Sequence, residues 1–378
     1  MGKLNVTILN KLHFDIKIEP FIFKPFEEQL IEIESTSSLF RTIRTHKGLR
    51  VGKQDNDLYV KKHKLDPEIF NDFNMVYDTR GQHKKAAYIK VVEALANPIL
   101  NYLPKNQTGF TDRPGTGLNL RFFNSYRINQ QGKYPVGPKD VFMSHGIGDK
   151  NYWIGSRIAD YHYALAVGPV WEKRMRDTGY KGEIFITGYT KLDPIFNKEI
   201  KVKENKKPYI VWAPTHIYNN KYKGRSSYPQ CLSLINEIPD TYEKALSLHP
   251  SSRLGRGDVQ NVSMEELYQA DVIIADAGST LYESWAIGKP VIFPDWICKK
   301  DILDSFTEGN LEYEIYDKGI GYHAKDMKDL IKLIDVALEK GMQEQETEFM
   351  EQVLPTKYRG KSGKYTAEAL KQIYKSFK

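Results

Sequence analysis

The sequence predicts an α/β protein with two Rossmann-like domains that face a cleft. The first observation is a repeated pattern in which a short apolar strand ends in a small or polar residue and a helix follows, as in "KDVFMSHG", "HYALAVGPVW" and "EIFITGY". The second is the same pattern starting again at "YIVWAPTH", after a polar, lysine-rich break at 201–208. Parallel sheets of this kind bind ligands at the carboxyl ends of their strands, so two such series favour a cleft between two sheets.

The lysine-rich break also sets the predicted domain boundaries. Residues 1–200 are expected to form the first α/β domain, in which 1–70 are hard to interpret, and residues 201–355 the second. Within the second, the stretch "AKDMKDLIKLIDVALEKG" at 324–341 should form an amphipathic helix that ends at Gly341, because its apolar residues recur at helical spacing.

Residues 356–378 are predicted to end in a helix that packs back on the first domain. Leu370, Ile373, Tyr374 and Phe377 share one face of that helix, which is typical of a buried face. Its other face is basic, so the alternative is peripheral contact with an anionic membrane surface.

Composition is that of a folded protein. The chain has 378 residues, of which 40% are hydrophobic, and a formal net charge of +7, which suits anionic ligands; no nucleic acid partner is expected. It lacks an apolar run of ~18 residues, and its start lacks the apolar core of a signal peptide, so we expect a cytoplasmic protein. Cys231 and Cys298 are too few for a disulfide framework or a cysteine-rich metal site.

The stretch "ADVIIADAGSTLYESWAIGKPVIFPDW" at 270–296 predicts a phosphate site. An apolar strand at 272–275 is followed by a Gly-Ser-Thr turn and a helix, for which Thr280 and Glu283 have the spacing of a capping box and Gly288 is a stop signal. A helix amino terminus at the carboxyl end of a strand suits the diphosphate of a nucleotide. The alternative is an ordinary strand–helix–strand connection.

Two histidines follow predicted strands, one in each half of the chain. His145 precedes Gly146 and His249 precedes Pro250, so both imidazoles would point into the cleft if the halves face each other. One could then act as general base on a hydroxyl, while the other, when protonated, could stabilise phosphate charge. The alternative is that each is structural, since the chain has nine histidines.

For two weaker signals, a structural interpretation is favoured over a functional one. Arg253, in "HPSSRLGRGD", could bind a phosphate, but a solvated loop is favoured. Asp55 and Asp57 have the D-x-D form that some glycosyltransferases use for a metal and a diphosphate, but a polar hairpin turn is favoured. We therefore predict no metal site and no cofactor.

The order of several motifs resembles the CDP-glycerol glycerophosphotransferase family of teichoic-acid synthesis. The motifs are a strand followed by "HG", then "GYTKLD", "WAPT", "LHP", "ADAGST" and "KPVIF", from about 139 to 300, with a weaker echo in "RGKSGKYTAEAL". The resemblance does not cover residues 1–135. It implies the two-domain GT-B architecture.

The resemblance also implies roles for individual residues. His145 matches the histidine thought to act as base on the acceptor hydroxyl, and His249 matches a histidine near the donor phosphates. Thr215 matches the threonine of the Ala-Pro-Thr motif. The donor diphosphate would lie at the helix start formed by Asp276, Gly278, Ser279 and Thr280.

Departures from the family pattern leave the donor open. The family's His-Gly-Thr-Pro is His-Gly-Ile-Gly at 145–148, and its Thr-Asp-Tyr-Ser-Ser is Ala-Asp-Ala-Gly-Ser at 275–279. "GSTLYESWAIGKPVI" also resembles the pattern of GT-B nucleotide-sugar enzymes, in which Glu283 would hold a ribose.

The favoured function is therefore a transferase that moves glycerophosphate or a related polyol phosphate from a CDP-linked donor to a cell-envelope glycan or glycolipid acceptor. Such an enzyme would work in the cytoplasm, with possible peripheral contact at the inner face of the membrane. A GT-B glycosyltransferase with a nucleotide-sugar donor is the alternative. A sugar-nucleotide epimerase comes next, but its site would need more carboxylates at the cleft. A non-enzymatic nucleotide-binding module would leave both histidines dispensable.

Overall fold

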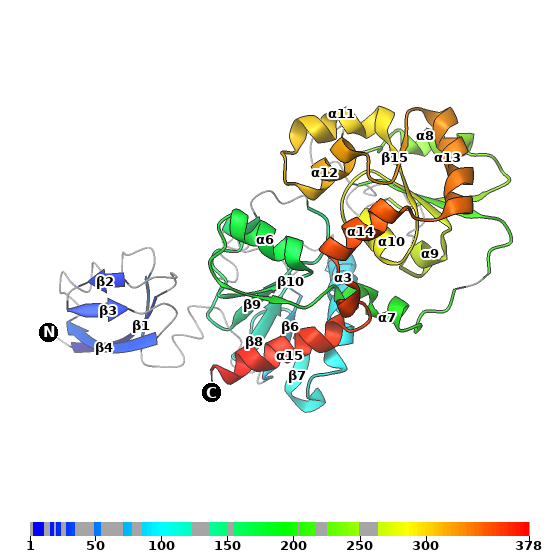
Figure 1. Ribbon diagram of the computed structural model, residues 1–378. Coiled ribbons are helices and arrows are strands. Elements are labelled where there is room, and N and C mark those ends of the chain that lie inside the picture. The colour runs from blue at the N-terminus through cyan, green and yellow to red at the C-terminus, as the bar shows by residue number, and fades with distance from the viewer. Residues whose placement is uncertain are drawn as a thin grey trace.

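The computed structural model describes most of the chain (Figure 1). The described residues are 3–10, 16–18, 20–23, 28–34, 49–53, 71–77, 85–122, 136–149, 154–202, 204–215, 225–248 and 264–377.

The described segments before residue 54 form two antiparallel sheets. Strand β1 (Lys3–Asn10) lies between β4 (Glu28–Glu34) and β5 (Leu49–Lys53), and β2 (Ile16–Ile18) pairs with β3 (Phe21–Phe23). The register pairs Leu4 with Ile33 and Val6 with Ile31. This part of the predicted first domain is therefore antiparallel β structure, and the α/β series begins only at residue 73.

A six-stranded parallel sheet follows, with the order β11-β10-β9-β8-β6-β7. Its strands are β6 (Phe73–Val76), β7 (Thr108–Thr111), β8 (Leu118–Arg121), β9 (Asp140–Met143), β10 (Tyr163–Ala166) and β11 (Glu183–Ile186). The connecting helices are α3 (Lys85–Leu100), η2 (Lys105–Gln107), α5 (Ile154–Arg157), α6 (Pro169–Asp177), η3 (Thr190–Leu192) and α7 (Asp193–Phe196).

The second parallel sheet has five strands in the order β13-β12-β14-β15-β16. Its strands are β12 (Tyr209–Ala213), β13 (Glu243–Leu246), β14 (Val272–Ala275), β15 (Val291–Pro294) and β16 (Tyr322–Ala324). The helices around it are α8 (Cys231–Leu234), η5 (Ile235–Glu237), α9 (Met264–Gln269), α10 (Ser279–Ala286), α11 (Asp295–Ser305), α12 (Leu311–Lys318), α13 (Met327–Lys340) and α14 (Glu344–Val353).

The central strands of the second sheet are apolar because helices cover both of its faces. All four residues of β14 are fully buried, as are Ile210, Val211 and Trp212 of β12. The indole of Trp212 donates to Ser227 Oγ at 3.0 Å, which satisfies its N–H inside the core. The predicted fold class is confirmed: two parallel α/β sheets, each with strand ends that meet at one edge.

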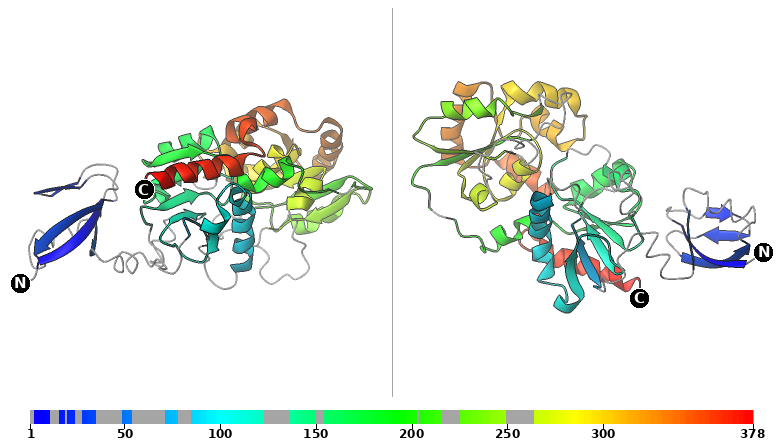
Figure 2. Two further views of the ribbon diagram at one scale, coloured as in Figure 1. Left: turned by 90° about the horizontal axis from the view of Figure 1, so that it is seen from below. Right: turned by 180° about the vertical axis from the view of Figure 1, so that it is seen from behind.

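The last helix returns to the first sheet. After η7 (Thr356–Tyr358), helix α15 (Ser362–Lys375) packs across α3, as Figures 1 and 2 show. The backbone N–H groups of Ser362 and Gly363 donate to the carboxylate of Asp193, at 3.2 and 2.7 Å, so Asp193 caps this helix from a distant segment. The chain therefore crosses from the first sheet to the second and then back to the first. These two crossings connect the sheets covalently.

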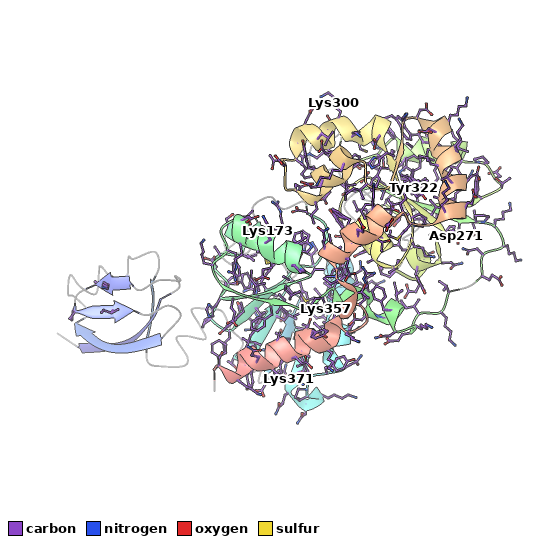
Figure 3. All side chains as sticks on the ribbon, in the orientation of Figure 1. Lys173, Asp271, Lys300, Tyr322, Lys357 and Lys371 are labelled. Atoms are coloured by element: carbon purple, nitrogen blue, oxygen red, sulfur yellow. The ribbon has the colours of Figure 1, made fainter. Side chains whose placement is uncertain are left out.

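Helix α15 buries its apolar face and exposes a basic one. Leu370 and Ile373 are buried, whereas Phe377 at the end is 36% exposed, and Lys371 points away from the helix on the outer surface (Figure 3). Over the residues that the structure describes, no helix combines the length and the apolar character needed to cross a bilayer.

Candidate functional site

His145 lies in the loop that follows β9, which we call the His145 loop (residues 144–149). Its side chain is exposed, and Nδ1 lies 3.2 Å from the carbonyl oxygen of Phe122. A carbonyl only accepts hydrogen bonds, so Nδ1 carries the proton, and in the neutral ring Nε2 holds the lone pair. This is the tautomer that a general base acting through Nε2 requires.

The helix start at Ser279 takes its geometry from Gly278. Gly278 has φ of 86°, a left-handed conformation that favours glycine, and it is the N-cap residue of α10 without a side chain to cap the helix. Ser279 and Thr280 are partly exposed. The amino terminus of α10 thus presents backbone N–H groups that no side chain of its own caps.

The predicted capping box of Thr280 and Glu283 is wrong. Helix α10 begins one residue earlier, at Ser279, so Glu283 occupies the fifth helical position and cannot reach back to the N-cap. The predicted strand at 272–275 and the stop signal at Gly288 are confirmed, since β14 covers Val272–Ala275 and α10 ends at Ala286.

Asp276 joins the loops after β12 and β14. It is fully buried, and its carboxylate accepts from the backbone N–H groups of Thr215 and Ala277, both at 2.7 Å. Ser227 donates to it twice, through its backbone N–H at 2.7 Å and its hydroxyl at 2.9 Å. Burial raises the pKa of Asp276, while these donors favour the ionised form and lower it. Asp276 and Thr215 therefore lie together, and their role visible in the structure is to position the turn before α10.

The His145 loop lies directly on the amino terminus of α10. The backbone N–H of Gly148 donates to Ser279 Oγ at 3.3 Å. A methyl group on Gly146 would lie 2.5 Å from the same hydroxyl oxygen, and one on Gly148 would lie 2.7 Å from the Gly278 backbone. The structure thus brings the loop that carries His145 together with Gly278 and Ser279, from opposite sheets.

Asp149 makes a second contact between the two sheets. Its carboxylate lies 3.0 Å from Arg174 Nε and accepts from the Leu311 N–H at 3.0 Å, at the start of α12. Its own N–H donates to Glu312, and its carbonyl accepts from the Asn310 amide. Burial raises the pKa of Asp149 to about 6, opposed by the charge of Arg174. Asp149 directly follows the His-Gly-Ile-Gly motif, but it was not among the predicted site residues.

Glu283 makes the third contact between the sheets. Its Oε1 accepts from Lys191 Nζ and from the Tyr189 hydroxyl, each at 2.8 Å, and its side chain is 4% exposed. Burial beside this carboxylate raises the pKa of Tyr189. A ribose at Glu283 would have to use Oε2 or displace these donors. Lys191 and Tyr189 belong to the "GYTKLD" motif, but neither side chain had a predicted role.

The other predicted site residues fall outside this contact. Thr280 is partly exposed on α10, with its carbonyl bonded to Ser284. His249, Arg253, Asp55 and Asp57 lie outside the described residues. Within the described ranges, three or more His, Cys, Asp or Glu side chains do not gather in a way that could hold a metal ion.

The chain is similar in fold to a polymerase of cell-wall synthesis. A variant of the wall teichoic acid polymerase TagF, soaked with CDPG, has a TM-score of 0.55 at 13% sequence identity, covering 85% of this chain and 92% of that chain. A second TagF variant has a TM-score of 0.54 at 14% identity, with the same coverage of both chains. This likeness shows a GT-B-like fold.

More distant is the UDP-GlcNAc 2-epimerase of Methanocaldococcus jannaschii, solved with UDP-GlcNAc and UDP. Its TM-score is 0.42 at 13% identity, covering 78% of this chain and 82% of that chain. No protein-family model matches the sequence, and a search of curated proteins finds no match either.

Proposed function

We propose that the protein is a transferase that moves glycerophosphate, or a related polyol phosphate, from a CDP-linked donor to a hydroxyl of a cell-envelope acceptor. The observation that carries the proposal is the contact between the His145 loop and the uncapped start of α10. A base on the first sheet then faces a candidate phosphate site on the second, both at the carboxyl ends of strands. We call the His145 loop and the start of α10 the two walls of this site. The fold likeness to TagF soaked with CDPG supports the choice of donor.

In this proposal the second sheet holds the donor and the first sheet presents the acceptor. The N–H groups at the start of α10, with the hydroxyls of Ser279 and Thr280, would bind the diphosphate, which suits a helix amino terminus. Asp276 would position that turn through its bonds to Thr215 and Ser227. His249 and Arg253 remain proposed donor ligands on the basis of the sequence motifs.

The reaction would be an in-line displacement at phosphorus. The acceptor hydroxyl attacks the phosphorus that bears the glycerol, its proton passes to Nε2 of His145, and the bond to the bridging oxygen breaks to release CMP. The positive end of α10 would stabilise the charge that develops on the phosphate oxygens.

The proposal is tested by ligand-induced changes in melting temperature. A ligand that binds only the folded protein raises Tm by mass action, so CDP-glycerol or CDP-ribitol should raise it, while UDP-GlcNAc and GDP-mannose should not. A shift with UDP-GlcNAc alone would favour the nucleotide-sugar alternative and contradict the proposed donor.

The site is tested by calorimetry on a variant of the helix start. Ser279→Ala should weaken CDP-glycerol binding by roughly ten-fold, since it removes one hydrogen bond to a charged group. Ser233→Ala, on the exposed side of α8, is the matched control and should bind as the parent does. Equal affinity of Ser279→Ala and the parent would contradict the assignment.

A further inference from the structure

We propose that Gly148 sets how closely the His145 loop approaches the start of α10, and that it is thereby a positioning residue for the transfer. The inference rests on the proposed function for its catalytic meaning. Its structural part, that a side chain at 148 forces the two walls apart, can be tested separately.

Gly148 is needed for space and not for its backbone conformation. It is not among the described glycines with positive φ, so alanine could adopt its conformation without strain. A methyl group there, however, would lie 2.7 Å from both Cα and C of Gly278 and 2.8 Å from the backbone nitrogen of Ser279. These are backbone atoms of the opposite wall, which no change of rotamer can move.

Gly146, two residues earlier, faces a side-chain atom that can rotate away, not backbone. A methyl group at Gly146 would meet the Ser279 hydroxyl at 2.5 Å, but the next atom, Ser279 Cβ, lies at 3.7 Å. Rotation of one hydroxyl relieves that contact. The two glycines therefore predict a graded response, in which alanine at 148 separates the walls more than alanine at 146.

The rest of the interface leaves little room for a local shift. Directly after Gly148, Asp149 is tied to α12 through Leu311 and Asn310, and Lys191 is paired with Glu283 on α10 itself. To move a methyl group from 2.7 Å to an ordinary contact of about 3.4 Å, the loop must retreat by about 0.7 Å. His145, three residues upstream, would retreat with it.

A retreat of this size is enough to affect chemistry. A misplacement of about 1 Å can cost roughly a hundred-fold in rate, because a general base must be within hydrogen-bond reach of the proton that it takes. Donor binding should change little, because the proposed donor ligands lie on the second sheet. Gly148→Ala should therefore lower kcat by roughly ten- to a hundred-fold, with the donor Kd within about three-fold of the parent.

The test combines crystal structures, donor calorimetry and turnover for Gly148→Ala, Gly146→Ala and Gly109→Ala. Gly109, in β7, is the matched control: a methyl group there would lie 2.8 Å from an atom, but that atom is the side-chain amide of Asn71, just before the neighbouring strand β6. We expect the gap between the backbone of residue 148 and the backbone of Gly278 to widen most in Gly148→Ala and to stay unchanged in Gly109→Ala. Backbone atoms are compared because rotation of the Ser279 hydroxyl does not move them.

The outcomes separate this inference from the function on which it rests. An unchanged gap in Gly148→Ala overturns the inference, and so does a longer gap with parental kcat, while the proposed function stands in both cases. If the parent itself transfers nothing from CDP-linked donors, the proposed function fails and the positioning role fails with it. Should Gly148→Ala not fold, Gly146→Ala decides: a longer gap with lower kcat and parental Kd supports the inference, and parental kcat despite a longer gap overturns it.

Discussion

Replacing Lys191 by methionine should destabilise the protein by isolating a buried carboxylate. Lys191 Nζ and the Tyr189 hydroxyl both lie 2.8 Å from Oε1 of Glu283, whose side chain is 4% exposed, while that of Lys191 is 18% exposed. Lys191→Met keeps the aliphatic stem but removes the cation, so the charge of Glu283 keeps the phenol of Tyr189 as a donor and loses its ion pair.

The magnitude follows from this burial. Breaking a buried ion pair by removing one partner costs about 3–5 kcal/mol, and the partial exposure of Lys191 lets water replace some of the lost interaction. We therefore expect a loss of about 2–3 kcal/mol in the free energy of unfolding. Glu283→Gln in the Lys191→Met background removes the stranded charge, so the double variant should recover to within about 1 kcal/mol of the parent.

Urea unfolding of the parent, both single variants and the double variant gives the coupling energy as a double-mutant cycle. We expect a coupling of about 2 kcal/mol. Additive single effects, or a loss below about 0.5 kcal/mol in Lys191→Met, would refute the view that this pair holds the two sheets together. The ribose interpretation of Glu283 predicts a different pattern, in which Glu283→Gln loses donor affinity with unchanged stability.

Two further predictions concern buried carboxyl groups. Burial raises the pKa of Glu346 from 4.5 to about 7, so the folded protein binds this proton more tightly than the unfolded chain. The contribution of Glu346 to the free energy of unfolding therefore falls as pH rises between those two values. The unfolding free energy of the parent, relative to non-titrating Glu346→Gln, should therefore rise by ~2.5 kcal/mol from about pH 8 to about pH 5, and a pH-independent difference in urea unfolding would contradict this. Asp276→Asn turns one of the two acceptor oxygens into a donor, which then faces the N–H groups of either Thr215 and Ala277 or Ser227. It should therefore cost roughly 2 kcal/mol of unfolding free energy and weaken donor binding. Parental stability and parental Kd in calorimetry would show that this carboxylate does not position the turn.

Much of the sheet architecture could be predicted from sequence because parallel strands covered on both faces are short apolar runs. The strand predicted at 272–275 coincides with β14, and the apolar strand predicted in "KDVFMSHG" is β9. The helix predicted within 324–341 is α13, because apolar residues at helical spacing, among them the buried Leu330 and Ile334, are visible in the sequence itself. These features depend on residues that are near in sequence.

The contacts between the two walls could not be predicted, because their partners are far apart in sequence. Glu283 bonds Tyr189 across 94 positions, and Asp149 bonds Glu312 across 163. A local pattern assigned Glu283 to a capping box, whereas its partners come from the other sheet. The sequence motifs did point to the His145 loop and the start of α10, but not to the glycine that limits their approach.

The most direct test of the central claim is the effect of His145→Ala on transfer and on donor binding, measured on the same protein. CMP release from CDP-glycerol, with a lipid-linked polyol-phosphate acceptor, should fall by roughly 10²–10⁴-fold, because the proton of the attacking hydroxyl has lost its base. The Kd for CDP-glycerol should stay within about three-fold of the parent, because the proposed donor ligands lie on the other wall. Parental CMP release by His145→Ala would contradict the account, and so would a loss of donor binding as large as the loss of turnover.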